Sequence, residues 1–277
     1  MTSVKFTKMH GLGNDFMVVN NLDGQYRFEP ARILAWSDRK TGIGFDQMLV
    51  LEQPTHPEAE FNYRIYNADG SEVEHCGNGA RCFARYVVDN KLTTSTAIKV
   101  QTCVGMIVLH NNDDGTVTVD MGVPTFVPQE IPFIADDQQA SYTIDVAGES
   151  IEAGVVTIGN PHVVLQVADT STARLEQLGP LLEHHERFPN RVNVGFMQII
   201  NRQHINLRVF ERGVGETRAC GSGACAAVAV GQNQGLLDKT VAVTLLGGDL
   251  NICWQNTTSS IEMTGACSTV FEGLTKM

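Results

Sequence analysis

The chain carries one Gly-rich cysteine motif twice, and this repetition limits the folds it can adopt more than any other feature. "CGNGA" begins at Cys76 and "CGSGA" at Cys220, so the two cysteines are 220 − 76 = 144 residues apart. Counting back from each cysteine, residues 64–80 align with residues 208–224 without a gap, and the arginine, aromatic and glutamate positions correspond. Similarity at a fixed offset indicates a repeated structural unit.

Two further blocks repeat in the same order. "GNDFMVV" from Gly13 corresponds to "GNPHVVL" from Gly159, an offset of 159 − 13 = 146, and "VDMG" from Val119 resembles "IEMTG" from Ile261. Three blocks at nearly one offset indicate an internal duplication. The length of 277 residues also fits two domains, because a domain usually has roughly 100–200 residues.

The segments between the repeated blocks predict an α+β fold rich in antiparallel strands. Apolar residues alternate over 61–67, which is typical of a half-buried strand. A hairpin turn is predicted at Asp114-Gly115, and two more hairpins over 154–169 and 198–211. Helices are predicted after each repeated cysteine, and the one over 224–237 is apolar on every face, so we expect it to be buried. Additional helices are expected over 30–39 and 172–185.

We interpret the chain as two pseudo-symmetric domains that arose by internal duplication. The predicted domains are 1–121 and 122–265, each a mostly antiparallel curved sheet or barrel around a central helix.

Composition excludes several classes of function. The net charge is −11, and the sequence has no lysine or arginine cluster that could follow a nucleic acid backbone. It has no apolar run of about 18 residues, so we expect no membrane span, and no signal peptide at its start. The seven cysteines lack a C-x-x-C pair, which argues against structural zinc, and we read His184-His185 as a solvated helix end rather than a metal site. We therefore expect reduced thiols in the cytoplasm, and no metal.

The repeated motif suggests a chemical role for its cysteine. The first amides of a helix lack internal partners and carry partial positive charge, so they can hold a carboxylate and lower the pKa of a nearby thiol. The glycines of both motifs keep these amides accessible. We read the other five cysteines as inert packing residues: Cys82, Cys103, Cys225, Cys253 and Cys267.

Two equivalent bases that face one substrate suit the inversion of a carbon centre. One group removes a proton from one face while the other delivers a proton to the opposite face. This division requires one thiolate and one thiol, so the two pKa values must be coupled or held apart. The sequence does not tell which cysteine is the resting thiolate.

Eight motifs in series resemble those of the diaminopimelate epimerases. They are MHGLGNDF (9–16), GIGFDQ (42–47), NADGSE (67–72), CGNGARC (76–82), GNPH (159–162), RVNVGF (191–196), ERG (211–213) and ACGSGACA (219–226). The resemblance implies a cofactor-independent enzyme that interconverts LL- and meso-2,6-diaminopimelate for bacterial lysine and peptidoglycan synthesis. It also implies an active site in a cleft between the two domains, a tail (266–277) that returns to the first domain, and a homodimer.

The resemblance also assigns site residues by position. It implies that Cys76 and Cys220 are the acid/base pair, supported by His162, and that Glu211 accepts from a substrate ammonium. The positions implied to bind substrate are Asn14, Gln47, Asn67, Gly77, Asn78, Asn160, Asn193, Glu211, Arg212, Gly221 and Ser222. Each of these could otherwise be a turn or sheet residue, and Asn67 and Asn160 lie in turn-like sequence.

Four alternatives remain open from the residues themselves. A pyridoxal-dependent racemase needs a Schiff-base lysine, and no lysine lies in a Gly-rich turn. A cysteine hydrolase could pair one thiol with His162 or His204, but it leaves the second cysteine motif unexplained. A binding protein explains a cleft but not two activated thiols. A racemase of the same fold, acting on an amino acid such as proline, is the nearest competitor.

Overall fold

The structure is a computed structural model and describes residues 3–73 and 76–277. The chain divides into two compact units. The N-terminal unit comprises Met1–Asp120 and Thr264–Met277, and the C-terminal unit comprises Met121–Met263.

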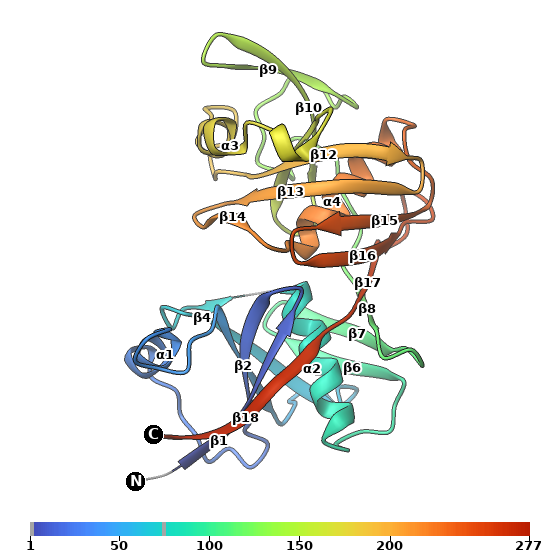
Figure 1. The fold of residues 1–277 in the computed structure, drawn as a ribbon. Helices are drawn as coiled ribbons and strands as arrows, with labels where there is room; N and C mark the ends of the chain where they lie inside the picture. Colours follow the sequence, from blue (N-terminus) through green and yellow to red (C-terminus); the bar gives the residue numbers. More distant parts are fainter. Residues whose placement is uncertain (1–2, 74–75) are drawn as a thin grey trace. The chain divides into compact units, whose positions relative to one another are not determined.

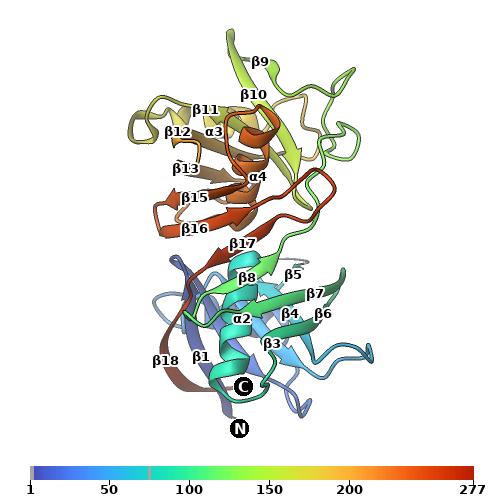
Figure 2. The ribbon, with the colours of Figure 1, turned by 90° about the vertical axis from the view of Figure 1, so that its right-hand side faces the viewer.

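The N-terminal unit is a mixed sheet with one helix against each face (Figures 1 and 2). Its helices are α1 (Pro30–Ser37) and α2 (Gly77–Asp89). Its strands are β1 (Ser3–Gly11), β2 (Asn14–Asn20), β3 (Gln47–Glu52), β4 (Phe61–Asn67), β5 (Glu72–Val73), β6 (Ala97–Thr102), β7 (Gly105–Asn111), β8 (Val117–Asp120) and β18 (Ser268–Lys276); β17 (Glu262–Gly265) lies at the boundary of the units.

Both faces of the N-terminal sheet are covered, which explains its long buried runs. Met17 and Val19 pack with Trp36 of α1 on one face, while Phe16 lies on the other face near α2. Strands that are buried on both sides read as continuous apolar runs rather than as an alternation. The β1–β2 turn has positive φ at both of its central residues, Leu12 (56°) and Gly13 (88°), the combination that hairpins favour.

The C-terminal unit repeats this arrangement. Its helices are α3 (Leu175–Glu183) and α4 (Gly221–Asn233), with a short 3-10 helix, η1 (Thr170–Thr172). Its strands are β9 (Tyr142–Val146), β10 (Glu149–Thr157), β11 (Pro161–Gln166), β12 (Asn193–Asn201), β13 (His204–Glu211), β14 (Gly215–Thr217), β15 (Thr240–Leu245) and β16 (Gly248–Cys253). The side chains of α4 are buried along most of its length, as its sequence predicts. A Cβ added at Gly154 of β10 would lie 2.3 Å from Val230 of α4, so only glycine allows this close approach.

Strand pairing follows one scheme in both units. The pairs β2–β3 and β11–β12 are parallel, and each is followed by an antiparallel pair, β3–β4 or β12–β13. One ion pair is repeated at the same place: Arg64 makes two hydrogen bonds to Glu72, and Arg208 makes two to Glu216. The mixed sheets with their helices agree with the predicted α+β class, although the sheets wrap around α2 and α4 without closing into barrels.

The C-terminal residues contribute to the N-terminal sheet. Strand β18 pairs antiparallel with β1, from Ser3 opposite Lys276 to His10 opposite Ser268. In the C-terminal unit, β9 pairs in the same way with β10. None of the helices in the described ranges is both long enough and apolar enough to cross a membrane.

Candidate functional site

Cys76 occupies the cap position of α2. Its backbone is extended (φ −147°), and its sulfur accepts a hydrogen bond from the amide of Gly79 at 3.4 Å. A Cβ at Gly79 would lie 2.5 Å from the hydroxyl oxygen of the buried Tyr63, so a larger residue would displace the start of the helix. The second glycine of this motif is therefore required by packing, and it also leaves an amide directed at the thiol.

Asn14 joins the first cysteine motif to the β1–β2 turn. The Cys76 thiol donates to Oδ1 of Asn14 at 3.8 Å, and Nδ2 of the buried Asn78 donates to the same oxygen at 3.2 Å. We call Asn14, Cys76 and Asn78 the Cys76 cluster. It places an amide oxygen beside a thiol at a helix N-terminus.

Gln47 and Asn67 form a separate pair on neighbouring strands. They lie opposite each other in the β3–β4 ladder, and Nε2 of Gln47 donates to Oδ1 of Asn67 at 3.0 Å. Oε1 of Gln47 is buried and has no hydrogen-bond partner among the described residues. A buried acceptor without a partner is costly, so this oxygen is suited to receive a donor from a ligand.

Cys220 occupies the equivalent cap position on α4 but has different neighbours. Its backbone is also extended (φ −120°), and its side chain is almost fully buried. The thiol donates to Oε2 of Glu211 at 3.1 Å, and Oγ of Ser222 lies 3.7 Å from the sulfur. Burial and the Glu211 carboxylate raise the pKa of the Cys220 thiol well above its usual value. Cys220 therefore holds its proton firmly.

His162 supports this second motif as a neutral side chain. Its Nε2 lies 2.9 Å from Oδ1 of Asn160 and 3.1 Å from Oγ of Ser222. Burial, with a smaller contribution from the positive charge of Arg212, lowers the pKa of His162 to about 3. The imidazole is thus uncharged near neutral pH and orients Ser222 through hydrogen bonding. We call Asn160, His162, Glu211, Cys220 and Ser222 the Cys220 cluster.

Asn193 and Arg212 contact each other rather than the cysteine. Asn193 is buried; its Nδ2 donates to the carbonyl of Pro161 at 2.9 Å, and its Oδ1 accepts the backbone amide of Arg212 at 3.0 Å. Nη1 of Arg212 donates to the carbonyl of Asn190 at 3.0 Å, and the side chain is otherwise exposed. Asn193 therefore fixes the backbone from which the Arg212 guanidinium extends.

The sequence-predicted site residues thus fall into four groups. Three or more meet at each cysteine, while Gln47–Asn67 and Asn193–Arg212 are pairs. Gly77 and Gly221 are the first residues of the two helices. Sequence reasoning missed Asp46, Tyr63 and Thr217, which interact with these groups, and Glu183, which accepts the backbone amide of Gly213 next to Arg212. Only Asp46 carried a signal, because it lies inside the motif GIGFDQ.

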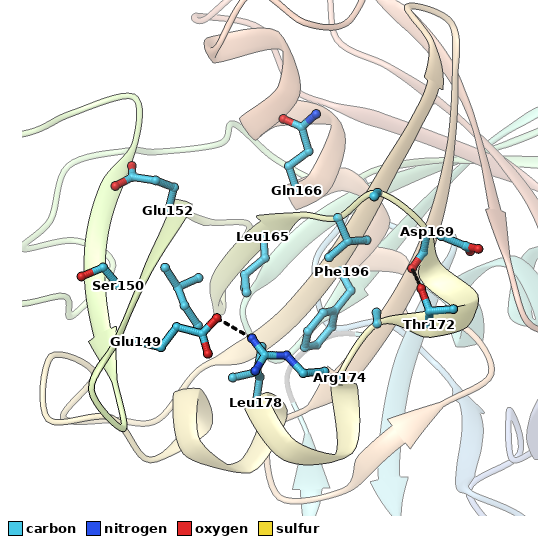
Figure 3. Close-up of a pocket in the computed structure, with 14 residues that line it drawn as sticks. Glu149, Ser150, Glu152, Leu165, Gln166, Asp169, Thr172, Arg174, Leu178 and Phe196 are labelled. Carbon is cyan, nitrogen blue, oxygen red and sulfur yellow. Dashed lines mark hydrogen bonds and ion pairs between the residues drawn. The ribbon is translucent and has the colours of Figure 1, made fainter.

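A hollow elsewhere in the C-terminal unit contains none of the predicted site residues. It has a volume of about 380 Å³ and lies between β10, β11 and the start of α3 (Figure 3). Its polar feature is an ion pair between Glu149 and Arg174 at 2.6 Å. Both of these side chains are about half exposed, and no cysteine is among the residues that line the hollow.

Comparisons with known proteins show which family the chain resembles. The model of the diaminopimelate epimerase family matches residues 6–127 and 154–270. Diaminopimelate epimerases from Pseudomonas entomophila (strain L48) and Azotobacter vinelandii (strain DJ / ATCC BAA-1303) are 53% and 52% identical over 274 residues, which is 99% of each chain compared.

Solved structures of more distant proteins share the fold. A Bacillus anthracis phenazine biosynthesis protein of the PhzF family superposes with a TM-score of 0.72 over all of both chains, at 15% identity. A hydroxyproline epimerase from Agrobacterium vitis superposes with a TM-score of 0.69 at 15% identity, covering 98% of this chain and 92% of the other. The predicted fold class is confirmed by these likenesses.

Proposed function

The chain belongs to the diaminopimelate epimerase family, and we propose how its two cysteine clusters carry out the epimerisation. The enzyme is an isomerase that interconverts LL- and meso-2,6-diaminopimelate in lysine biosynthesis. Inversion at one α-carbon requires a proton to leave one face and another to arrive at the opposite face. The observation that carries the proposal is the pair of helix-capping thiols, Cys76 and Cys220, at equivalent places in the two units.

We assign the resting proton to Cys220. The pKa of Cys220 is raised by burial and by Glu211, which outweigh the amide hydrogen bond from Gly223, whereas Cys76 has the corresponding amide hydrogen bond from Gly79 and lies beside the neutral amide of Asn14. In one direction the Cys76 thiolate removes the α-proton and the Cys220 thiol delivers its own proton to the other face. In the reverse direction the roles exchange. This mechanism requires both thiols to face one carbon, from opposite sides.

The helix N-termini stabilise the charge that develops during proton abstraction. We propose that the amides of Gly77, Asn78, Gly221 and Ser222 hold the α-carboxylate at the reacting end. Amides at a helix start favour anions, and the carboxylate becomes more electron-rich as the α-carbon loses its proton. The chain's own thiols and amides supply every proton and donor in this scheme, so the proposed reaction needs no cofactor.

The remaining assigned residues recognise the polar groups of the substrate. Oε1 of Gln47 offers a buried acceptor, and the exposed guanidinium of Arg212 can make two parallel bonds to the distal carboxylate. Glu211 is assigned to the substrate ammonium once the Cys220 proton has been transferred. The other assigned ligands are Asn14, Asn67, Asn160 and Asn193, the last acting through Arg212.

We further propose a cytoplasmic homodimer. The mechanism needs reduced thiols, which the cytoplasm maintains. Strand β18 exposes Val270, Phe271 and Leu274 to 55%, 46% and 73%, a concentration of apolar surface on one strand that favours a protein contact. Light scattering on the purified protein tests this; a monomer at micromolar concentration would contradict the dimer.

The test of function is an epimerisation assay without added cofactor. Purified protein is incubated with LL-diaminopimelate, and the meso isomer is separated chromatographically. The expected result is an approach to equilibrium from either isomer, with no turnover of L-proline by the same preparation. Proline racemisation without diaminopimelate turnover would support the competing racemase instead.

A further inference from the structure

The amide of Asn14 makes different contacts at its two ends. Nδ2 donates to Oδ2 of Asp46 at 2.9 Å, while Oδ1 accepts from Asn78 at 3.2 Å and from the Cys76 thiol at 3.8 Å. Turning the amide over would place its NH2 against the NH2 of Asn78 and its oxygen against the Asp46 carboxylate. Both contacts would be repulsive, so this environment specifies one orientation.

Asp46 is itself held by several donors. Its Oδ2 also accepts the backbone amide of Asp15 at 3.1 Å, and its Oδ1 accepts Nη2 of Arg39 at 2.6 Å. Arg39 makes two more bonds to Asp15, at 2.8 and 2.9 Å, and the buried Lys8 pairs with Asp15 at 2.6 Å. Although burial opposes its ionisation, Asp15 has a pKa well below its usual range because of the bonds from Arg39 and Lys8. Asp15 is therefore ionised at neutral pH, and Arg39 bridges it to Asp46.

We propose that Asp46 is a positioning residue for proton transfer at Cys76, because it fixes the Asn14 amide with its oxygen, rather than its NH2, toward the thiol. This inference rests on the proposed role of Cys76 as an acid/base residue. The Asn14 oxygen accepts the S–H group that forms when Cys76 takes the substrate proton. Without Asp46 only the Asn78 contact still favours this orientation, so the amide turns more readily and its NH2 then favours the thiolate instead.

Titratable groups that interact with Cys76 in the described part of the chain include the Tyr63 hydroxyl and the Cys82 thiol, both buried. Burial raises the pKa of each well above its usual value, so both stay neutral below about pH 9. Comparing the Cys76 ionisation between variants that differ only at Asn14 and Asp46 therefore measures the effect of this contact and of the Asp46 charge.

The test is a double-mutant cycle in which the reactivity of the Cys76 thiol is measured directly. The rate of Cys76 alkylation by iodoacetamide is measured against pH, by peptide mass spectrometry, in wild type, Asn14→Ala, Asp46→Ala and the double variant. Each single variant should move the profile to lower pH, because the acceptor that favours the protonated thiol is lost or turned away. The double variant should match Asn14→Ala, since Asp46 acts through Asn14. Additive shifts, or no shift in Asp46→Ala, would overturn the proposal.

Two further variants separate positioning from charge and from folding. Asp46→Asn removes the charge and keeps one acceptor oxygen. It should therefore shift the pH profile of Cys76 alkylation by less than Asp46→Ala does, but measurably. In an Asn14→Ala background, Asp46→Asn should cause no further shift. It also keeps the test informative if the alanine variant does not fold. Asp238→Ala removes a comparable half-exposed aspartate paired with Arg202 and should leave the Cys76 profile unchanged. Equal shifts in Asp46→Asn and Asp46→Ala would show a charge effect alone and contradict the proposal.

Turnover provides an independent reading. Asp46→Ala should lower kcat/KM by about tenfold, the loss expected for one oriented hydrogen bond, with no further loss in the double variant relative to Asn14→Ala. Alkylation does not depend on turnover. If the wild-type enzyme failed to epimerise diaminopimelate, the proposed function would be refuted. The alkylation experiment would still test whether Asp46 acts on Cys76 through Asn14.

Discussion

The carboxylate of Glu211 lies 3.1 Å from the thiol sulfur of Cys220, whereas the equivalent cysteine, Cys76, has the neutral amide of Asn14 as its side-chain neighbour at 3.8 Å. The two cysteine motifs are nearly identical in sequence and in backbone. Their neighbours are not, and a carboxylate favours a protonated thiol far more than an amide oxygen does. The duplicated scaffold therefore gives its two thiols different neighbours, and we propose that the carboxylate keeps Cys220 protonated so that it acts as the acid while Cys76 acts as the base.

Each capping cysteine should be separately required. Cys76→Ser and Cys220→Ser keep the side-chain shape but replace an ionisable thiol with a much weaker acid, so each should lower kcat by about 10²–10⁴-fold. Steady-state kinetics measure the loss, and circular dichroism checks the fold. Cys103→Ser and Cys253→Ser serve as matched controls and should retain activity. Near wild-type turnover in either capping variant would refute the two-base assignment.

Neutralising Glu211 should make Cys220 more acidic. Glu211→Gln removes the negative charge beside a thiol whose pKa is raised by burial and by that charge, so alkylation of Cys220 should begin at lower pH than in wild type. The variant should also lose about tenfold or more in kcat/KM. Peptide-resolved alkylation measures the first effect. An unchanged Cys220 profile would mean that burial alone sets its acidity.

The buried His162 should make the protein sensitive to mild acid. Burial lowers the pKa of His162 to about 3 from an ordinary value of 6.5. Between pH 6.5 and pH 3 the imidazole is therefore protonated in the unfolded chain but neutral in the folded chain. Stability should therefore fall as the pH drops below about 6.5, by up to about 5 kcal/mol near pH 3. Urea unfolding from pH 7.5 to 4 should show a flatter pH dependence for His162→Asn. His56→Asn, at an exposed site, should keep the wild-type slope.

Solvent hydrogen should appear in the product from the first turnover. If one thiol removes the α-proton and the other delivers its own, product formed in deuterated water carries deuterium at the inverted carbon. Substrate recovered early should remain protiated, because the abstracting thiol returns the original proton to the face it came from. Chiral separation with mass spectrometry at low conversion measures both pools. Product that retained the original proton would indicate a single base that reaches both faces.

The repeat carried most of the fold information that the sequence contained. Because Arg64 and Glu72 correspond to Arg208 and Glu216 in the alignment, the sequence predicted that one structural unit occurs twice, and the structure shows the same bidentate contact in both units. The apolar pattern of α4 also predicted its burial, since a helix without a polar face has no side to present to water.

The side-chain contacts within each cysteine cluster could not be predicted from the sequence. The residues next to Asn193 in the sequence do not show that its side-chain amide makes hydrogen bonds at both ends. Its partners are the backbones of Pro161 and Arg212, which are 32 and 19 residues away. The side chain that a thiol meets depends on which strands curve past the helix start. Motifs could therefore name Cys76 and Cys220, but only the fold shows that one meets an amide and the other a carboxylate.

The pairing of β18 with β1 imposes an order on synthesis as well as on structure. Ser3 lies opposite Lys276, so β1 is synthesised long before the strand β18 with which it pairs. The C-terminal unit draws all its residues from 121–263 and can close earlier. Pairing across such a sequence separation is entropically expensive and slow. We therefore expect one edge of β1 to stay unpaired during most of translation. An unpaired strand edge can bind a chaperone or pair with another chain, so we expect this segment to be the one most prone to aggregation.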